Sequence, residues 1–154
     1  MGDSKDSQKF VEFAKAFLKE AREDLVVADE LLESKRYARS VFSSQQCVEK
    51  SVKALLEAEG IFAAEHDLST LFVKFIYKNE KYAEFKKILD SILENIDYFE
   101  GEWSKTRYHK EKDGKIVIPI EVYKQEEAVT AYGKAEEVFD SIKEILIKKF
   151  NFKF

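Results

Sequence analysis

Apolar residues recur every three or four positions along most of this chain, which is the periodicity of amphipathic helices. The first stripe of this kind runs from Phe10 to Leu32 and predicts a long helix over about residues 8–34. The seven residues before it are small or polar and predict a flexible tail at residues 1–7. Most charged residues of the predicted helix fall off the stripe, so we expect them to face solvent.

The later stripes predict four more helices, over about residues 37–59, 67–78, 81–100 and 124–150. Gly60 follows the second of these, where a glycine in the left-handed conformation commonly ends a helix. Asp67 precedes the third, and its carboxylate can accept a free backbone N–H of the first turn. The apolar stripe of the last helix includes alanines such as Ala128 and Ala135.

The helical period is lost over residues 101–123. In this segment the turn dipeptide Asp113–Gly114 separates RYHKEK from IVIPI, which predicts a short β-hairpin or an ordered loop. Pro119 would keep any such strand at an edge. The whole pattern predicts an all-α, up-and-down antiparallel bundle of about five helices, in one domain over residues 8–150, with this insertion before the last helix.

Composition narrows the class of protein further. The 154 residues suit one domain, and 5 Gly with 1 Pro are too few turn-forming residues for a many-stranded sandwich or barrel. No apolar stretch approaches the length of a membrane span, and the N-terminus has no signal-peptide core. Cys47 is the only cysteine, so no intrachain disulfide can form and the reducing cytoplasm is the expected compartment. The net charge of -4 argues against a strongly basic nucleic-acid module but leaves a local basic patch open.

Polar residues interrupt the second predicted helix at SSQQCVEK, residues 43–50. Gln46, Glu49, Lys50 and Lys53 follow at spacings of three and four, so they lie near one another on the helix surface. An amide can read a base edge, a lysine can pair with phosphate, and a glutamate can orient the lysine. Two other interpretations stay open for this cluster, which also includes Gln45. It could form an internal polar network or dimer interface, or a plain solvated surface.

A second candidate is the segment KTRYHKEKDGK, residues 105–115, which carries five cations against two carboxylates. Tyr108 and His109 place rings among these cations. Bases stack on rings while cations hold phosphates, so the composition suits single-stranded RNA. The alternative is an exposed hairpin tip that its lysines keep soluble.

Metal and cofactor chemistry find little support in the chain. It has two histidines and one cysteine, with no Glu-x-x-His motif and no Gly-rich phosphate loop, so we expect no metal and no cofactor. His66, just before a predicted helix, is more simply a packing or capping residue than a ligand. Cys47 is expected to be a small buried residue. Three phenylalanines end the chain and would either dock onto the bundle or contact a partner.

The stretch from Tyr37 to Leu56 combines an aromatic residue, the run Gln45-Gln46-x-x-Glu49-Lys50, and then Lys53-Ala54-Leu55. It resembles the signature helix of the HEPN (higher eukaryotes and prokaryotes nucleotide-binding) domain family. Three further pieces resemble the family in order: Asp24-Leu25 with Ala28 and Leu31-Leu32, His66-Asp67-Leu68 with Leu71, and Arg107-Tyr108 followed by Ala128 and Ala135. The resemblance spans about residues 10–147.

The resemblance implies an antiparallel helical bundle that often dimerises and is linked to nucleotide or RNA binding. Some family members are metal-independent ribonuclease toxins, often paired with a small nucleotidyltransferase antitoxin. We therefore expect a cytoplasmic homodimer that binds nucleotide or RNA and works with a nucleotidyltransferase partner. In this hypothesis Arg107 and Lys53 contact phosphate, Tyr108 stacks on a base, and Gln46 and Glu49 orient the ligand.

Ribonuclease activity is an alternative that the sequence supports less well. The catalytic pattern of the family is an arginine with a histidine four to six residues later. The histidine would act as acid or base, and the arginine would stabilise the charged phosphorane. Here His109 follows Arg107 by only two residues, so the expected spacing is absent. Arg107 and His109 stay the candidate catalytic pair. The other alternative is a non-catalytic dimerisation or docking scaffold.

Overall fold

The computed structural model describes residues 4–62, 67–102, 106 and 108–154. Within these ranges the chain forms six α-helices, one two-stranded sheet, a π-helical turn (η1) and a 3-10 helix (η2). The α-helices are α1 Ser4–Glu33, α2 Tyr37–Ala58, α3 Leu68–Phe72, α4 Lys86–Glu102, α5 Pro119–Val122 and α6 Gln125–Phe150. The strands are β1 Lys110–Lys112 and β2 Lys115–Val117. The π-helical turn η1 is Val73–Tyr77, and the 3-10 helix η2 is Glu80–Phe85.

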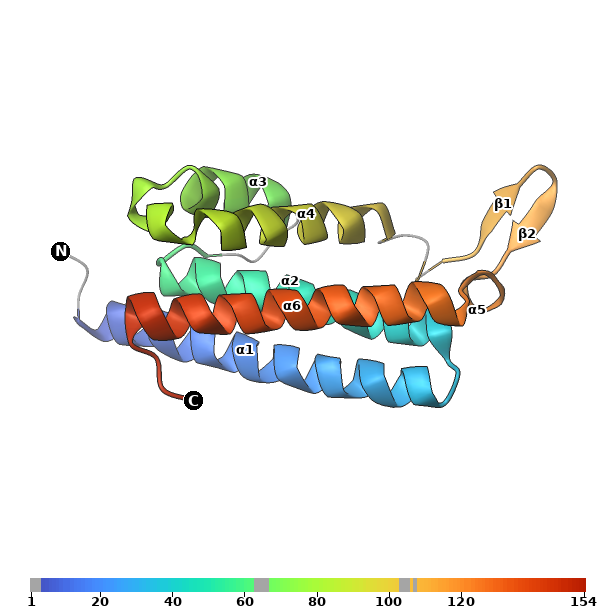
Figure 1. Cartoon of the computed structure of the whole chain (residues 1–154), viewed down its shortest axis with the longest axis horizontal. Coiled ribbons are helices and arrows are strands. Elements are labelled where there is room, and N and C mark those ends of the chain that lie inside the picture. The colour runs from blue at the N-terminus through green and yellow to red at the C-terminus, as the bar shows by residue number, and fades with distance from the viewer. Residues whose placement is uncertain (1–3, 63–66, 103–105, 107) are drawn as a thin grey trace.

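The four long helices, α1, α2, α4 and α6, lie side by side and alternate in direction, as Figure 1 shows. Helix α2 packs against α1 and α6, and α4 packs against α6. The short α3 packs against the later part of α4, where the Ser69 hydroxyl donates to the Asp97 carboxylate at 3.5 Å, and η2 leads directly into α4. The hairpin and α5 lie at the end of the bundle where α2 and α6 begin (Figure 1). The predicted all-α antiparallel bundle is confirmed.

Helix α2 lies at the centre of the core. Its Val41, Val52 and Leu55 are fully buried. Small residues of both neighbouring helices are also fully buried, namely Ala21 on α1 and Ala135 on α6, and the Cys47 thiol of α2 lies 3.9 Å from the Ala135 carbonyl oxygen. Small side chains let helix axes approach closely, so the centre of α2 is packed on several sides.

The ends of the predicted helices are reproduced where a local capping residue marks them. Gly60 has a φ of +80°, the left-handed conformation expected after α2. The Asp67 carboxylate accepts a hydrogen bond from the Thr70 backbone N–H at 3.2 Å, so Asp67 is the N-cap of α3. This bond and one from the Thr70 hydroxyl, at 2.6 Å, hold the pKa of the carboxyl below its usual value. Helix α1 begins at Ser4, earlier than the periodicity predicted.

The insertion before the last helix is a β-hairpin followed by a short helix. Strands β1 and β2 are antiparallel, with Lys110 opposite Val117 and Lys112 opposite Lys115. Asp113 and Gly114 both have positive φ, at 54° and 77°, which a two-residue turn of type I′ requires. The periodicity did not predict α5. Pro119 begins this helix, because the fixed φ of proline suits the first helical position.

The chain end packs back onto the bundle. Asn151 adopts a left-handed conformation with a φ of 57° and ends α6. The Phe152 N–H then donates to the Leu146 carbonyl at 3.2 Å, and the Phe152 side chain is 6% exposed. Phe154 stays 57% exposed. In the described part of the chain, no helix has the length and apolar character that crossing a membrane requires.

Candidate functional site

The polar cluster on α2 forms hydrogen bonds within its own helix. The Gln46 side-chain amide donates to Glu49 at 3.2 Å, and the Lys53 ammonium donates to the other oxygen of Glu49 at 3.0 Å. All three side chains are partly buried. The Lys53 ammonium also lies 6.0 Å above the ring of Phe17 on α1. Glu49 therefore links Gln46 and Lys53, as the predicted spacing allowed.

Lys50 connects α2 to α1. Its ammonium lies 2.8 Å from the Asp24 carboxylate and 3.5 Å from that of Glu20. Partial burial by itself would lower the pKa of Lys50, but these two carboxylates outweigh it and hold the pKa above its ordinary value. Because both lysines of the cluster already face carboxylates, the contacts favour an internal polar network over a phosphate site.

Gln45 lies deeper than Gln46 and connects three parts of the chain. It is 4% exposed, and its amide nitrogen donates to the Phe99 carbonyl near the end of α4 at 3.2 Å. Its amide oxygen accepts a long hydrogen bond, 3.4 Å, from the hydroxyl of Thr106, which is itself 2% exposed. Helix α2 thus reaches into the segment that leads to the hairpin.

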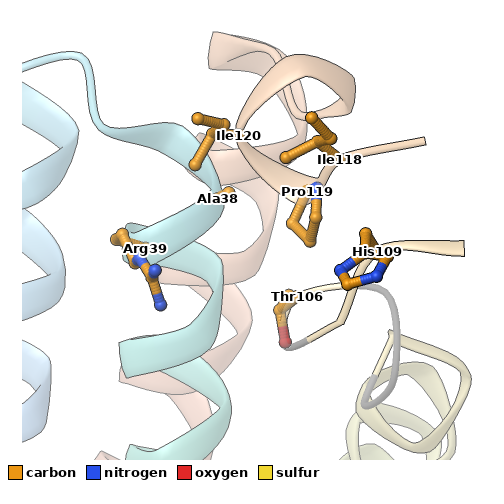
Figure 2. Close-up of a pocket in the computed structure, with 7 residues that line it drawn as sticks. All are labelled: Ala38, Arg39, Thr106, His109, Ile118, Pro119 and Ile120. Carbon is orange, nitrogen blue, oxygen red and sulfur yellow. The ribbon is translucent and has the colours of Figure 1, made fainter. Parts of the chain in front are cut away.

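A pocket of about 220 Å³ opens at this end of the bundle. Figure 2 shows Arg39, from α2, on one side and Thr106 with His109 on the other. Ala38, Ile118, Pro119 and Ile120 complete the lining. The pocket therefore combines an apolar surface with a guanidinium and an imidazole, which come from segments far apart in the sequence.

Exposed groups of two kinds lie near His109 in the sequence. Tyr108, which precedes His109, is 60% exposed. The hairpin that follows carries Lys110, Lys112 and Lys115, all exposed. The insertion thus carries an exposed ring, an imidazole that lines the pocket, and several exposed cations on the hairpin that extends from the bundle.

The structure places only some of the predicted site residues. Arg107, one half of the candidate catalytic pair, lies outside the described residues, as do Lys105, His66 and Trp103. Arg39 was not among the predicted site residues, since it has no histidine near it in the sequence. The spacing places Gln45 in the polar cluster of α2 but gives no sign of its contact with Thr106. No sequence signal joins Arg39 to His109, because only the fold brings α2 against the insertion.

Cys47 lies on the buried side of α2, as predicted. It is fully buried, and this burial raises the pKa of the thiol to about 12. A nucleophilic cysteine needs a lowered pKa and solvent access, so the geometry gives Cys47 a packing role. Among the described residues, no group of three or more histidine, cysteine, aspartate or glutamate side chains could hold a metal ion.

Comparison with known proteins agrees with this architecture. The chain is 38% identical over 148 residues to "Putative toxin MJ1304" of Methanocaldococcus jannaschii, and the match covers 96% of this chain and 97% of that protein. The crystal structure of TT1696 from Thermus thermophilus is similar with a TM-score of 0.60 and 27% identity, over 85% of this chain and 96% of that one.

The crystal structure of ST0689, an archaeal HEPN homologue, shares the fold with a TM-score of 0.55 and 24% identity, over 85% of this chain and 95% of that one. The family model of the HEPN domain matches residues 14–145, which include all four long helices in whole or in large part. This protein therefore belongs to the HEPN domain family.

Proposed function

We propose that this HEPN protein binds single-stranded RNA at the end of the bundle that carries the pocket. The observation that carries the proposal is the shared pocket of Arg39 and His109, with the exposed Tyr108 beside it. Arginine recognises phosphate with paired hydrogen bonds, and an exposed aromatic ring is a surface on which a base can stack. The lysines of the hairpin add a sequence-independent attraction for the backbone.

The size of the pocket supports a small target group. Pockets for drug-sized ligands have volumes of roughly 300–1,000 Å³, whereas this one is about 220 Å³. Its apolar side, formed by Ile118, Pro119 and Ile120, suits the face of one base, and Arg39 suits the adjoining phosphate. We therefore favour a chain of nucleotides, with one base in the pocket, over a free nucleotide held entirely inside it.

The wider role that we propose is that of a toxin working with a partner. The similarity to a protein named as a toxin supports this role, and the family resemblance suggests a small nucleotidyltransferase as the partner antitoxin. We further propose a cytoplasmic homodimer. Of the residues expected from the sequence, Tyr108 stays in the proposed RNA site, and Arg107 stays a candidate through its place beside Tyr108 in the sequence. Gln46, Glu49, Lys50 and Lys53 are assigned instead to the polar network that α2 forms internally and with α1.

A metal-independent ribonuclease is the second candidate, and one observation favours it. Arg39 and His109 line the same pocket although the sequence lacks the Arg-x(4-6)-His spacing. In space, therefore, a histidine able to exchange a proton with the 2′-hydroxyl lies across the pocket from an arginine able to stabilise the phosphorane. Arg39 thereby joins Arg107 as a candidate partner of His109.

The test is a titration of a labelled single-stranded RNA with the whole protein in EDTA, by gel shift and by a cleavage assay. We expect Arg39→Ala to weaken binding about tenfold, which is the loss of one charge-assisted contact. Arg22→Ala is the matched control, because Arg22 is an exposed arginine of α1 that does not line the pocket. Its affinity should equal that of the wild type.

The outcomes separate the candidates. Equal affinity of Arg39→Ala and Arg22→Ala, or no gel shift by the wild type, would contradict RNA binding at this pocket. Cleavage by the wild type in EDTA that His109→Ala abolishes would instead establish the ribonuclease.

A further inference from the structure

We infer that Gln45 is a positioning residue that sets the shape of the pocket without contacting its ligand. In this view the buried amide of α2 holds Thr106, and with it the side of the pocket that carries His109, at a set distance from Arg39. The inference rests on the proposed function for its RNA measurement. Gln45 makes two hydrogen bonds, to two different groups, and shares its helix with Arg39.

The first group is the carbonyl of Phe99. It is one of the last four carbonyls of α4, which ends at Glu102, and such carbonyls have no partner inside the helix. The amide nitrogen of Gln45 donates to it at 3.2 Å, in a part of the protein where Phe99 is only 3% exposed. Gln45 thus fixes where α4 ends and where the segment towards the hairpin begins.

The second group is the hydroxyl of Thr106, which donates to the amide oxygen of Gln45 at 3.4 Å. Both side chains are almost completely buried, and a buried polar group that loses its partner costs free energy. Thr106 also lines the pocket, three residues before His109. The amide therefore connects the end of α4 to a lining residue of the pocket.

The amide of Gln45 makes both bonds at once, since it carries a donor and an acceptor at the same end. A glutamate at this position would place an ionised oxygen against the Phe99 carbonyl, and two acceptors cannot share a hydrogen bond. The chemistry therefore selects glutamine here, independently of any ligand.

Helix α2 carries both Gln45 and Arg39. Arg39 precedes Gln45 by six residues on the same helix, a separation of about 9 Å along its axis. Arg39 forms one side of the pocket, and Gln45 anchors the opposite side through Thr106. A rigid helix thus carries both the arginine and the amide that positions the facing residues, so the width of the pocket depends on Gln45.

The test compares Gln45→Met, which keeps the approximate shape but makes neither bond, with Thr106→Val and Thr106→Ser. Ser51→Ala is the matched control, because Ser51 is another fully buried polar residue of α2 whose hydroxyl bonds within the helix, to Cys47. Circular dichroism and thermal melting confirm that each variant is folded. Two readouts follow, the RNA affinity and the fluorescence of Trp103, the only tryptophan, which lies between Phe99 and Thr106 in the sequence.

We expect Gln45→Met and Thr106→Val to change the emission or acrylamide quenching of Trp103 and to weaken RNA binding roughly five- to tenfold. Thr106→Ser, which keeps the hydroxyl, and Ser51→Ala should match the wild type in both readouts. Folded Gln45→Met and Thr106→Val proteins with wild-type fluorescence, or with altered fluorescence but wild-type RNA affinity, would overturn the inference.

Failure of the proposed function would be recognised separately. If the wild type binds no RNA, the RNA proposal fails, and the Trp103 readout alone decides whether Gln45 holds the segment. Should Gln45→Met fail to fold, the pair Thr106→Val and Thr106→Ser decides, because valine replaces the hydroxyl by a methyl group of similar size, whereas serine keeps the hydroxyl and loses only the methyl.

Discussion

Neighbouring residues of α2 have different roles because a helix turns by about 100° per residue. Gln45 is buried and reaches α4, whereas Gln46 is partly exposed and bonds to Glu49 on the same helix. The sequence predicted that both belong to a polar cluster, but it could not distinguish their environments. Burial of each side chain depends on what packs against α2, and that information is absent from the spacing.

The burial of Cys47 predicts how its thiol reacts with an alkylating reagent. Because burial raises the pKa of its thiol to about 12, the thiol stays protonated and inaccessible at about pH 8. We expect no labelling by iodoacetamide in the native protein and complete labelling in denaturant, measured by mass spectrometry. Rapid native labelling would show that α2 is far more accessible than the packing indicates. The raised pKa also makes stability fall as pH rises from 9 towards 12, since only the unfolded thiol ionises there.

Single elements depend on local conformations that the sequence reveals directly. The turn of the hairpin needs a positive φ at Asp113 and Gly114, and the dipeptide by itself predicts such a turn. The turn dipeptide does not predict where the hairpin lies relative to the bundle. It extends from the end of the bundle in Figure 1, and both strands are mostly exposed. An isolated two-stranded hairpin is marginally stable, so its turn residues carry much of its order.

Gly114→Val tests this dependence. A β-branched residue is strained at a φ of +77°, so we expect residues 110–117 to exchange amide hydrogens faster, as measured by mass spectrometry. The global free energy of unfolding should change by less than about 0.5 kcal/mol, because the hairpin is outside the core. Under our proposal RNA affinity falls as well.

Gly133→Ala is the control for that substitution. Gly133 lies inside α6 with open space where a side chain would be, so alanine should stabilise the protein by roughly 0.5–1 kcal/mol. Unchanged exchange in Gly114→Val would contradict the role given to the turn.

At the scale of the whole molecule, the end of the chain meets its first helix. After α6 the chain turns at Asn151, and Phe152 is buried beside Lys15 of α1, whose ammonium lies 5.8 Å from the ring. The sequence left open whether the terminal phenylalanines dock onto the bundle or contact a partner. In the structure Phe152 docks, while Phe154 remains exposed.

These two phenylalanines form a matched pair for a stability prediction. Phe152→Ala should lower the free energy of unfolding by about 3 kcal/mol, because a buried ring is lost and a cavity remains. Phe154→Ala should change it by no more than about 0.5 kcal/mol in the monomer. Denaturant titration of both variants measures the difference, and equal destabilisation would show that the tail does not dock in solution. A loss of dimer in Phe154→Ala alone would mark Phe154 as a partner contact.

The sequence by itself determined the long helices, several of their ends, the hairpin turn and the family, but not the short helix α5. These features depend on hydrophobic periodicity, capping residues and turn residues, which act over a few neighbouring positions. Only the tertiary structure decided that Lys50 pairs with Asp24 of α1, that Gln45 reaches Phe99 and Thr106, and that Arg39 shares a pocket with His109. Each of these contacts joins segments distant along the chain. Helix packing and the path of the insertion bring them together, and neither is encoded in local spacing.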